Sequence, residues 1–241
     1  MKILSVSTAT NHLSVALNQA EQVLAEVNEQ DERNHSEHLA PVIAAMLVKK
    51  QLKLKDLDRF AVAIGPGSYT GLRIGVTTVK MFASILNIPV VGISTLAALA
   101  ANVPAPNTLV LALIDARNTN YFAGAYLAGK SLIPDGHYPL EQLVNQVQAL
   151  CMKHGYELTI VGSGLTAASV AFKAAGCAFQ LGAKEANYPH AGVIGRLAIN
   201  AKPVDPDMLL PNYLRRTQAE VDWHHQTGQD YQPDSNYVEE V

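Results

Sequence analysis

The sequence predicts an α/β protein of two tandem lobes, each with a mixed sheet and flanking helices. Two observations lead to this fold class. Residues 4–11 and 112–119 each end an apolar strand in a polar turn that precedes another strand, so the two halves echo each other. Between the halves, the prolines of Val103-Pro104-Ala105-Pro106-Asn107 interrupt the periodic pattern, which is typical of a short, stiff linker. The predicted units are a first lobe at 1–103, a second lobe at 108–216 and a tail at 217–241.

The first lobe opens with short apolar segments joined by polar turns, which predicts a meander of strands. Apolar residues at helical spacing follow, and they alternate with further apolar runs. The predicted strands are 2–7, 12–17, 22–28, 59–64 and 88–94, and the predicted helices are 35–49, 68–86 and 95–102. Pro41 lies inside the first helix, where it removes a hydrogen bond, so the helix should bend or restart there.

The second lobe repeats this order of elements. Its predicted strands are 108–115, 121–127, a short 131–133 and 158–161, and its predicted helices are 139–154, 165–176 and 189–200. The turn Gly162-Ser163-Gly164 follows the last of these strands. In the acidic tail, Thr217-Gln218-Ala219-Glu220 has the pattern of a capping box, which predicts a short helix with Trp223 packed back on the domain before a disordered end.

The composition is that of a globular protein, because 49% of the 241 residues are hydrophobic and 16% are charged. The apolar N-terminus is interrupted at Asn11, too early for a secretory signal or a membrane span. We therefore expect a cytoplasmic protein that does not contact a membrane. Cys151 and Cys177 lack the spacing of metal ligands and are interpreted as structural thiols.

The charge balance bears on nucleic-acid binding. A net charge of −3 offers little of the basic surface with which proteins neutralise tRNA phosphates. The densest basic run ends a predicted helix, where cations interact favourably with the helix dipole, so a solvated helix end is a better interpretation than a tRNA patch. That run is Lys49, Lys50, Lys53 and Lys55.

A glycine-rich run connects a predicted strand to the helix at 68–86. It reads Gly65-Pro66-Gly67-Ser68-Tyr69-Thr70-Gly71-Leu72-Arg73-Ile74-Gly75. Glycines allow a tight turn and a close approach of backbone amides, and Ser68 or Thr70 can cap the helix, so the run predicts either anion binding or close packing. It lacks the Gly-Lys-Ser/Thr end of a P-loop and the glycine spacing of a dinucleotide fingerprint.

As a whole, this run resembles the GPGSFTGLRIG signature of the B subunit of the bacterial tRNA threonylcarbamoyladenosine synthase. Other segments resemble motifs of the same family in the same order: Arg33-Asn34-His35-Ser36-Glu37-His38-Leu39-Ala40-Pro41, Gly92-Ile93-Ser94-Thr95-Leu96, Asp115-Ala116-Arg117 and Pro211-Asn212-Tyr213-Leu214-Arg215. The resemblance covers most of the chain. It implies the actin-like ATPase fold of actin, sugar kinases and heat-shock chaperones, in which two lobes close a cleft.

The resemblance also implies a function. The family's B subunit has no catalytic activity of its own and pairs with a catalytic paralogue, which works with an ATPase subunit. Together they transfer threonylcarbamoyl from threonylcarbamoyl-AMP to N6 of the adenosine 3′ to the tRNA anticodon. The chain is therefore expected to be a non-catalytic partner subunit that serves tRNA modification indirectly, and that pairs with the catalytic subunit or forms a homodimer.

The residues leave nucleotide binding open. Catalytic members of the superfamily end the first strand in an aspartate near the metal and phosphates, whereas this chain has Ser7, which lacks the charge that attracts a divalent ion. Asp115 occupies the equivalent place in the second lobe. The candidates for a weak ATP or ADP site are Gly65, Gly67, Asp115, Gly162 and Gly164. They support the alternative function, an ATP-dependent small-molecule kinase or ATPase of the same fold.

His35 and His38 would share a helix face with Glu37 between them, an arrangement that is metal-capable in itself. No third ligand or general base accompanies them, and Asn34 followed by Glu37 is the pattern of a helix start. We therefore expect neither a metal site nor metallopeptidase activity from this pair.

The helices at 35–49 and 68–86 carry wide apolar stripes, which are typical of helices buried on more than one side. Core packing explains part of each stripe, but in the resembled family these helices meet the catalytic subunit or a second copy. The residues predicted to contact a partner are Leu39, Ile43, Met46, Leu72, Arg73, Val76, Val79 and Phe82. Arg73 admits two interpretations, a structural ion pair within the chain or an anchor in the partner surface.

Overall fold

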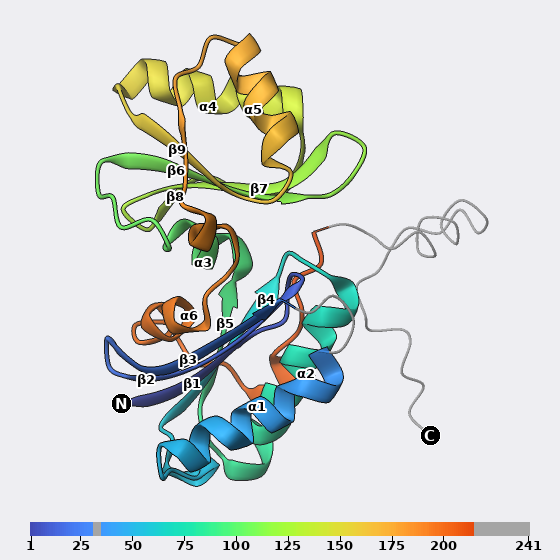
Figure 1. Ribbon diagram of the computed structural model, residues 1–241, viewed down its shortest axis with the longest axis vertical. Coiled ribbons are helices and arrows are strands. Elements are labelled where there is room, and N and C mark those ends of the chain that lie inside the picture. Colours follow the sequence, from blue (N-terminus) through green and yellow to red (C-terminus); the bar gives the residue numbers. More distant parts are fainter. Residues whose placement is uncertain (31–34, 215–241) are drawn as a thin grey trace, which may run out of the picture.

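A computed structural model describes residues 1–30 and 35–214, and it contains two lobes that follow one another along the long axis (Figure 1). The first lobe is built on a five-stranded sheet with the order β3-β2-β1-β4-β5. The first three strands pair antiparallel as a meander, while β4 and β5 run parallel to β1. The strands are β1 (Lys2–Ser7), β2 (His12–Gln19), β3 (Gln22–Gln30), β4 (Arg59–Gly65) and β5 (Val90–Ser94).

The second lobe repeats this topology. Its sheet has the order β10-β9-β6-β7-β8, in which β6, β7 and β8 form an antiparallel meander and β9 and β10 are parallel additions. The strands are β6 (Thr108–Asp115), β7 (Asn120–Leu127), β8 (Lys130–Pro139), β9 (Glu157–Gly162) and β10 (Gln180–Leu181). The predicted fold class, two mixed sheets with flanking helices in an actin-like ATPase arrangement, is confirmed.

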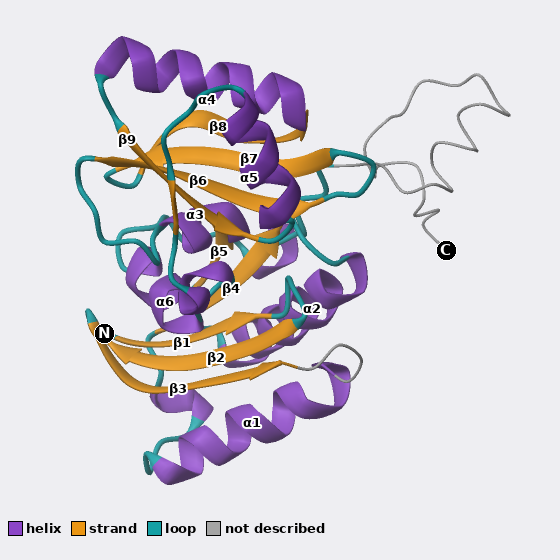
Figure 2. Ribbon diagram, turned by 45° about the horizontal axis from the view of Figure 1, so that its top comes forward, coloured by secondary structure: helices purple, strands orange, loops and turns teal. Residues whose placement is uncertain are grey.

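Helices cover both faces of the first sheet and the outer face of the second (Figure 2). Below the first sheet lie α1 (His35–Lys49) and α2 (Tyr69–Leu86), packed against one another. Between the two sheets lies α3 (Thr95–Ala100), which contacts strands of both lobes. The second sheet is covered by α4 (Leu140–His154) and α5 (Leu165–Ala174). Short 3-10 helices occur at η1 (Leu54–Asp56), η2 (Lys184–Asn187) and η3 (Pro206–Met208).

The last α-helix, α6 (Ala191–Ala198), packs on the first sheet, against β2 and β1, although the predicted second lobe at 108–216 includes it. Its small residues explain the placement, because Gly192 and Gly195 allow a close approach to β3 and β2. A Cβ atom at Gly195 would lie 2.5 Å from the Asn18 side chain. The chain therefore returns to the first lobe after the second sheet is complete.

The structure departs from the predictions for two elements. The third strand of the second lobe is predicted at 131–133 only, but β8 extends to Pro139. Pro134 and Asp135 form a bulge opposite Gly124, and β8 is an edge strand, where a residue without an amide hydrogen is tolerated. For Pro41 the prediction was a bend or a restart of α1, and the restart is not seen, because the helix is continuous from His35 to Lys49. The predicted cap at Asn34 and the predicted tail helix with Trp223 lie outside the described residues.

The bulge in β8 creates a polar clamp between the lobes. Asp135 accepts hydrogen bonds from the Tyr126 hydroxyl within the second sheet and from the Ser94 hydroxyl at the end of the first. Gly124 leaves the space that this carboxylate needs, and burial and the contact with Asp135 raise the pKa of Tyr126. Beside the clamp, α3 contributes Leu96 to an apolar cluster shared by both lobes. The interlobe contact therefore combines a buried apolar cluster with hydrogen bonds to a carboxylate.

A second polar contact holds α6 to the first lobe. Glu26 on β3 accepts a hydrogen bond from the Gly192 amide at 2.9 Å, and its Oε1 lies 3.4 Å from Nδ1 of His190. Burial by itself would raise the pKa of Glu26, but the contacts with His190 and Gly192 lower it. The hydrogen bond to Glu26 raises the pKa of His190 despite its burial. The two groups therefore stabilise each other's charged forms.

We expect Asp135→Ala to lower the free energy of unfolding by about 1–3 kcal/mol, because it removes the acceptor of two hydroxyl groups, one of them buried. Urea denaturation measures the change, with Glu157→Ala, an exposed carboxylate on β9, as the control. A loss no greater than that of the control would show that the clamp does not stabilise the fold.

For the pair of Glu26 and His190, we expect Glu26→Gln to cost about 1 kcal/mol of stability in a defined pH window. The raised pKa of His190 adds stability that is fully present below its usual pKa of 6.5 and is lost as the pH rises through the raised value. The lowered pKa of Glu26 adds stability that is present above its usual 4.5 and is lost as the pH falls through the lowered value. Denaturation across pH should therefore show the largest difference between these two usual values, and a difference independent of pH would contradict the pairing.

Candidate partner surface and interlobe sites

The glycine-rich turn between β4 and α2 is packed against the turn that follows β1. Ser68, one of the two residues predicted to cap this helix, caps α2 by accepting a hydrogen bond from the Gly71 amide. The Ser68 amide donates to the Ala9 carbonyl at 2.7 Å, and the Thr8 hydroxyl donates to the Gly71 carbonyl at 2.6 Å. A Cβ atom at Gly67 or at Gly71 would overlap the carbonyl oxygens of that turn. Close packing, one of the two predicted roles, therefore explains these glycines.

The C-terminal segment closes over the same turn. The Asn212 amide donates to the Ile64 carbonyl at 2.6 Å, and a Cβ atom at Gly65 would lie 2.5 Å from the Asn212 carbonyl oxygen. Gly65 also has a φ of +124°, in the region that favours glycine. The Pro211-Asn212-Tyr213 motif thus lies beside the glycine-rich turn, although the two are far apart in sequence.

The second lobe has a similar arrangement at Gly162 and Gly164. A Cβ atom at Gly162 would overlap the Leu113 carbonyl, and one at Gly164 would meet the Tyr121 ring. Asp115 lies beside Gly164, and its amide donates to the Ser163 hydroxyl at 2.9 Å. The structure therefore brings together the three second-lobe nucleotide candidates, and their surroundings are filled by the chain's own atoms.

These groups do not fit a metal-bound nucleotide in the manner of the catalytic superfamily. Ser7 is fully buried at the end of β1, so its hydroxyl cannot reach a phosphate or a cation from the cleft. The carboxylate of Asp115 is exposed but accepts a hydrogen bond from the Arg117 amide at 2.8 Å, which holds it within its own turn. The five glycine and aspartate candidates are accounted for by packing and turn formation.

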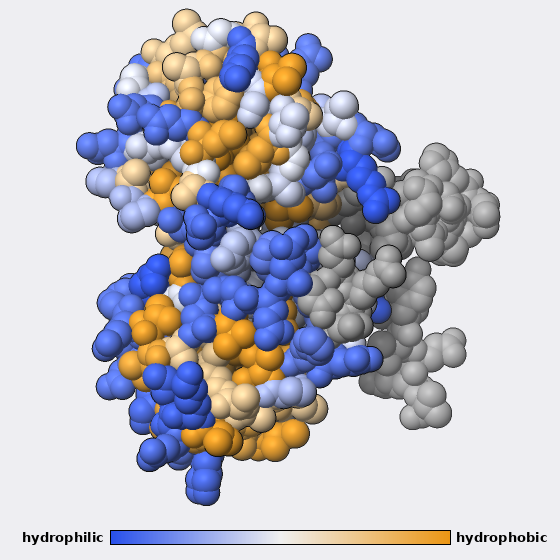
Figure 3. All heavy atoms as spheres, viewed as in Figure 1, coloured by the Kyte–Doolittle hydropathy of each residue, from blue (hydrophilic) through white to orange (hydrophobic). Residues whose placement is uncertain are grey.

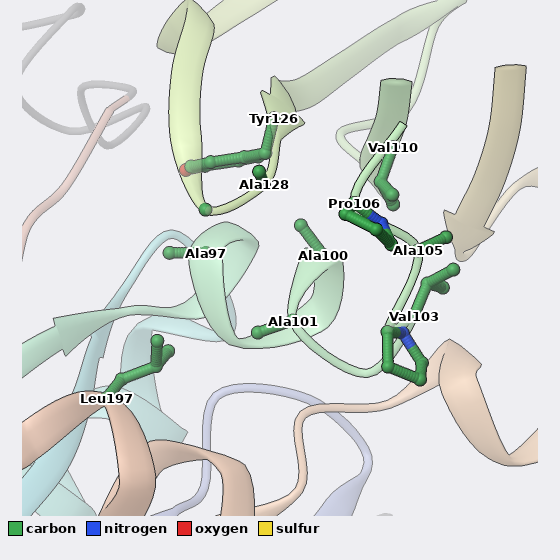
Figure 4. A pocket seen from close by; sticks show the side chains of 12 residues that line it. Ala97, Ala100, Ala101, Val103, Ala105, Pro106, Val110, Tyr126, Ala128 and Leu197 are labelled. Atoms are coloured by element: carbon green, nitrogen blue, oxygen red, sulfur yellow. The ribbon is translucent and has the colours of Figure 1, made fainter. Parts of the chain in front are cut away.

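A pocket of about 400 Å³ lies at the interlobe linker, away from these turns (Figure 4). Ala97 and Ala100 of α3 face Tyr126 and Ala128 across it, and Pro106 of the linker closes one side. Its lining is almost entirely apolar, so it offers no charged group to a phosphate. Sequence reasoning missed this pocket, because the small residues of α3 that create it appear in the sequence only as helix formers.

The two histidines that share a face of α1 have separate partners. His35 is nearly buried, and its Nε2 lies 2.9 Å from the Thr10 carbonyl oxygen. His38 is exposed and faces Glu29, with its Nδ1 3.4 Å from a carboxylate oxygen. Across residues 1–30 and 35–214, no three His, Cys, Asp or Glu residues are grouped as metal ligands would be.

Six of the eight residues predicted to contact a partner are buried in the first lobe itself, which corrects that assignment. Their side chains fill the contact of α1 and α2 with the sheet, so they are not exposed to a partner. They are Leu39, Ile43, Met46, Leu72, Val76 and Val79. Phe82 is half-buried against the same core, and Arg73 is exposed.

A different set of side chains faces outward from these helices. Val48 on α1 is 76% exposed and Ile85 on α2 is 74% exposed, so most of each apolar side chain contacts solvent. With their exposed uncharged neighbours they form the surface that we call the outer face: Pro41, Ala44, Ala45 and Val48 on α1, and Thr77, Met81, Ser84 and Ile85 on α2. Figure 3 shows hydrophobic residues gathered at this end of the first lobe between hydrophilic ones. In the sequence, the uncharged residues at 41, 44, 45 and 48 recur at helical spacing, and this was the available signal for a second stripe on α1.

Arg73 lies in a cluster with two tyrosines at the N-terminal end of α2. Its guanidinium lies over the Tyr69 ring, 4.4 Å from the centroid, and its Nε donates to the Tyr213 hydroxyl at 3.2 Å. The rings of Tyr69 and Tyr213 are stacked at 4.6 Å. The predicted alternative of a structural ion pair is not seen, since no ion pair in the described part of the chain includes Arg73.

The four lysines of the basic run at the end of α1 are exposed, which both a solvated helix end and a tRNA patch require; they are Lys49, Lys50, Lys53 and Lys55. None of the helices in the described ranges combines the length and apolar character that crossing a membrane requires.

Comparison with known proteins agrees with this architecture. The model of the family described as TsaD, tRNA N6-adenosine threonylcarbamoyltransferase, matches residues 22–223. The tRNA threonylcarbamoyladenosine biosynthesis protein TsaB of Bacillus subtilis is 30% identical over 227 residues, which are 92% of this chain and 98% of that protein.

Two solved structures from Pseudomonas aeruginosa are also similar. YeaZ has a TM-score of 0.73 at 27% identity, covering 88% of this chain and 99% of that one. A second protein, described as similar to the peptidase YeaZ, has a TM-score of 0.74 at 25% identity and covers 89% of this chain and 99% of that one. The chain therefore belongs to the TsaB family of tRNA threonylcarbamoyladenosine biosynthesis proteins.

Proposed function

We propose that the chain is a non-catalytic subunit in the biosynthesis of tRNA threonylcarbamoyladenosine. Its relative in Bacillus subtilis is named for that pathway. In this proposal the chain binds a catalytic paralogue in the cytoplasm, where an ATPase subunit also acts, and the paralogue transfers threonylcarbamoyl from threonylcarbamoyl-AMP to N6 of the adenosine 3′ to the anticodon. The observation that carries the proposal is the outer face, an exposed and uncharged surface on helices whose inner sides are already filled.

The chemistry of the outer face supports a protein partner. Contiguous apolar surface that is rimmed by polar residues is typical of protein contact sites. The small side chains of Ala44 and Ala45 on α1 allow another helix to approach closely. A catalytic paralogue and a second copy of this chain are both occupants of this kind, and a homodimer in the absence of the paralogue would use the same face. We keep the division of the chain at 1–103 and 108–216 as a proposal based on the sequence repeat, although α6, near the end of the second range, packs on the first sheet.

The absence of catalytic function is supported by the site itself. The first strand ends in the buried Ser7, and among the described residues Asp115 is not part of a group of His, Cys, Asp or Glu side chains that could hold a metal ion. The alternative, a kinase or ATPase of the same fold, keeps the exposed Asp115 as its one supporting observation. In the proposed function tRNA is reached through a partner, since the net charge is −3 and the lysines gather at one helix end.

We expect Ile85→Glu to leave the fold intact and to weaken association with the catalytic paralogue by at least about tenfold, because a carboxylate is costly to bury in an apolar contact. Val170→Glu is the matched control, since Val170 is an exposed apolar residue on α5 of the other lobe. Analytical ultracentrifugation and calorimetric titration measure the effect. Wild-type binding by Ile85→Glu would place the partner elsewhere.

For catalysis, we expect the isolated chain to hydrolyse ATP no faster than buffer with or without Mg²⁺, because no described group supplies a nucleophile, a base and a metal site together. Phosphate release and calorimetric titration with ADP are the measurements. Metal-dependent turnover that disappears in Asp115→Ala would favour the kinase or ATPase alternative.

A further inference from the structure

Arg73 is held in one orientation before any partner arrives. The Tyr69 ring supports one face of its guanidinium, and the hydrogen bond from Nε to Tyr213 fixes the rotation of the planar group. Tyr213 belongs to the C-terminal segment, which is itself tied to α2 by the hydrogen bond from Lys80 Nζ to the Asp207 carbonyl at 2.9 Å. An arginine that is fixed in this way loses less conformational entropy on binding than a free one.

The fixed guanidinium still has donors to offer. Its Nε is used by Tyr213, while its two Nη groups have no hydrogen-bond partner among the described residues. The cluster is also accessible, because Tyr69 is 41% exposed and Tyr213 is 39% exposed. Two parallel N–H groups on one edge of a guanidinium match the two oxygens of a carboxylate or a phosphate.

The surroundings favour a carboxylate on a protein over a phosphate on RNA. The cluster lies on α2, the helix that carries half of the outer face, and the same C-terminal segment exposes Met208 and Leu210. Lys80, the nearest lysine on α2, already donates to a backbone carbonyl. Binding to RNA requires several cations that neutralise successive phosphates. A single fixed arginine beside apolar residues is instead typical of a protein hot spot.

We propose that the Tyr69–Arg73–Tyr213 cluster is an anchor that receives a carboxylate of the protein partner, with Tyr69 and Tyr213 as positioning residues. The inference rests on the proposed function, because it assigns a chemical group to the partner that binds the outer face. It adds that the partner surface carries an Asp or Glu at the N-terminal end of α2, and that recognition there depends on the planar fork and not on charge alone.

The test measures binding of the purified catalytic paralogue to the wild-type chain and to Arg73→Ala, Arg73→Lys and Tyr213→Phe, at low and at physiological salt. Arg73→Ala and Arg73→Lys should each weaken binding about tenfold, because lysine keeps the charge but lacks the fork. Tyr213→Phe should weaken it less, since it removes only the hydrogen bond that orients Arg73. The wild-type affinity should fall more steeply with salt than that of Arg73→Ala.

Two controls separate the possible failures. Lys130→Ala removes an exposed cation at the hairpin between β7 and β8 and should bind as the wild type does. Circular dichroism and thermal midpoints check that each variant is folded. If the wild type binds and the Arg73 variants bind equally well, the anchor is wrong while the proposed function stands. If the wild type does not bind the paralogue at all, the anchor and the proposed function are both overturned. If Arg73→Ala weakens binding to labelled tRNA but not to the paralogue, the anion is a phosphate and the assignment to a protein carboxylate is wrong.

Discussion

The close approach of two backbone turns is the constraint on which the first lobe depends. The turn after β1 places the carbonyl groups of Thr8 and Ala9 where side chains at Gly67 and Gly71 would otherwise lie. The same contact provides hydrogen bonds to both turns, so the start of α2 is fixed relative to the sheet. The orientation of α2 then determines which residues face outward, and it positions the Arg73 cluster. A side chain at either glycine would displace the helix that carries the proposed partner surface.

Much of the fold could be predicted from the sequence, because the repeated order of apolar runs and turns is a local signal. The meanders, the linker and the long helices depend on periodicity, and the structure has them within a few residues of the predicted positions. The extension of β8 could not be predicted, since Pro134 is a strand breaker unless the strand lies at an edge. The packing of α6 on the first sheet could not be predicted either, because it depends on complementary surfaces that are far apart in the sequence.

The candidate site was predicted at the level of helices but not of side chains. An apolar stripe shows that a helix is buried, yet it does not show whether a sheet or another protein covers it. Val79 and Ile85 are both apolar residues of α2, and only the three-dimensional structure shows that the first is fully buried and the second largely exposed. Arg73 was identified because it lies in the first turns of a helix that meets a partner in the resembled family. Its tyrosine neighbour at 213 comes from a distant motif, which no local pattern connects to it.

The packing of the glycine turns and the contact between the lobes bear on both parts of the proposed function, the lack of catalysis and the binding of a partner. An enzyme of the actin-like fold needs a cleft with room for nucleotide and lobes that move relative to one another. Here the glycine turns are filled by the chain's own carbonyl groups, and the lobes are joined through α3 and the clamp at Asp135. The filled turns leave no room for a phosphate where the glycines lie, and the hydrogen bond from Ser94 to Asp135 must break before the lobes can separate. In the proposed function, a lobe that is preorganised by these contacts loses less conformational entropy when a partner binds the outer face.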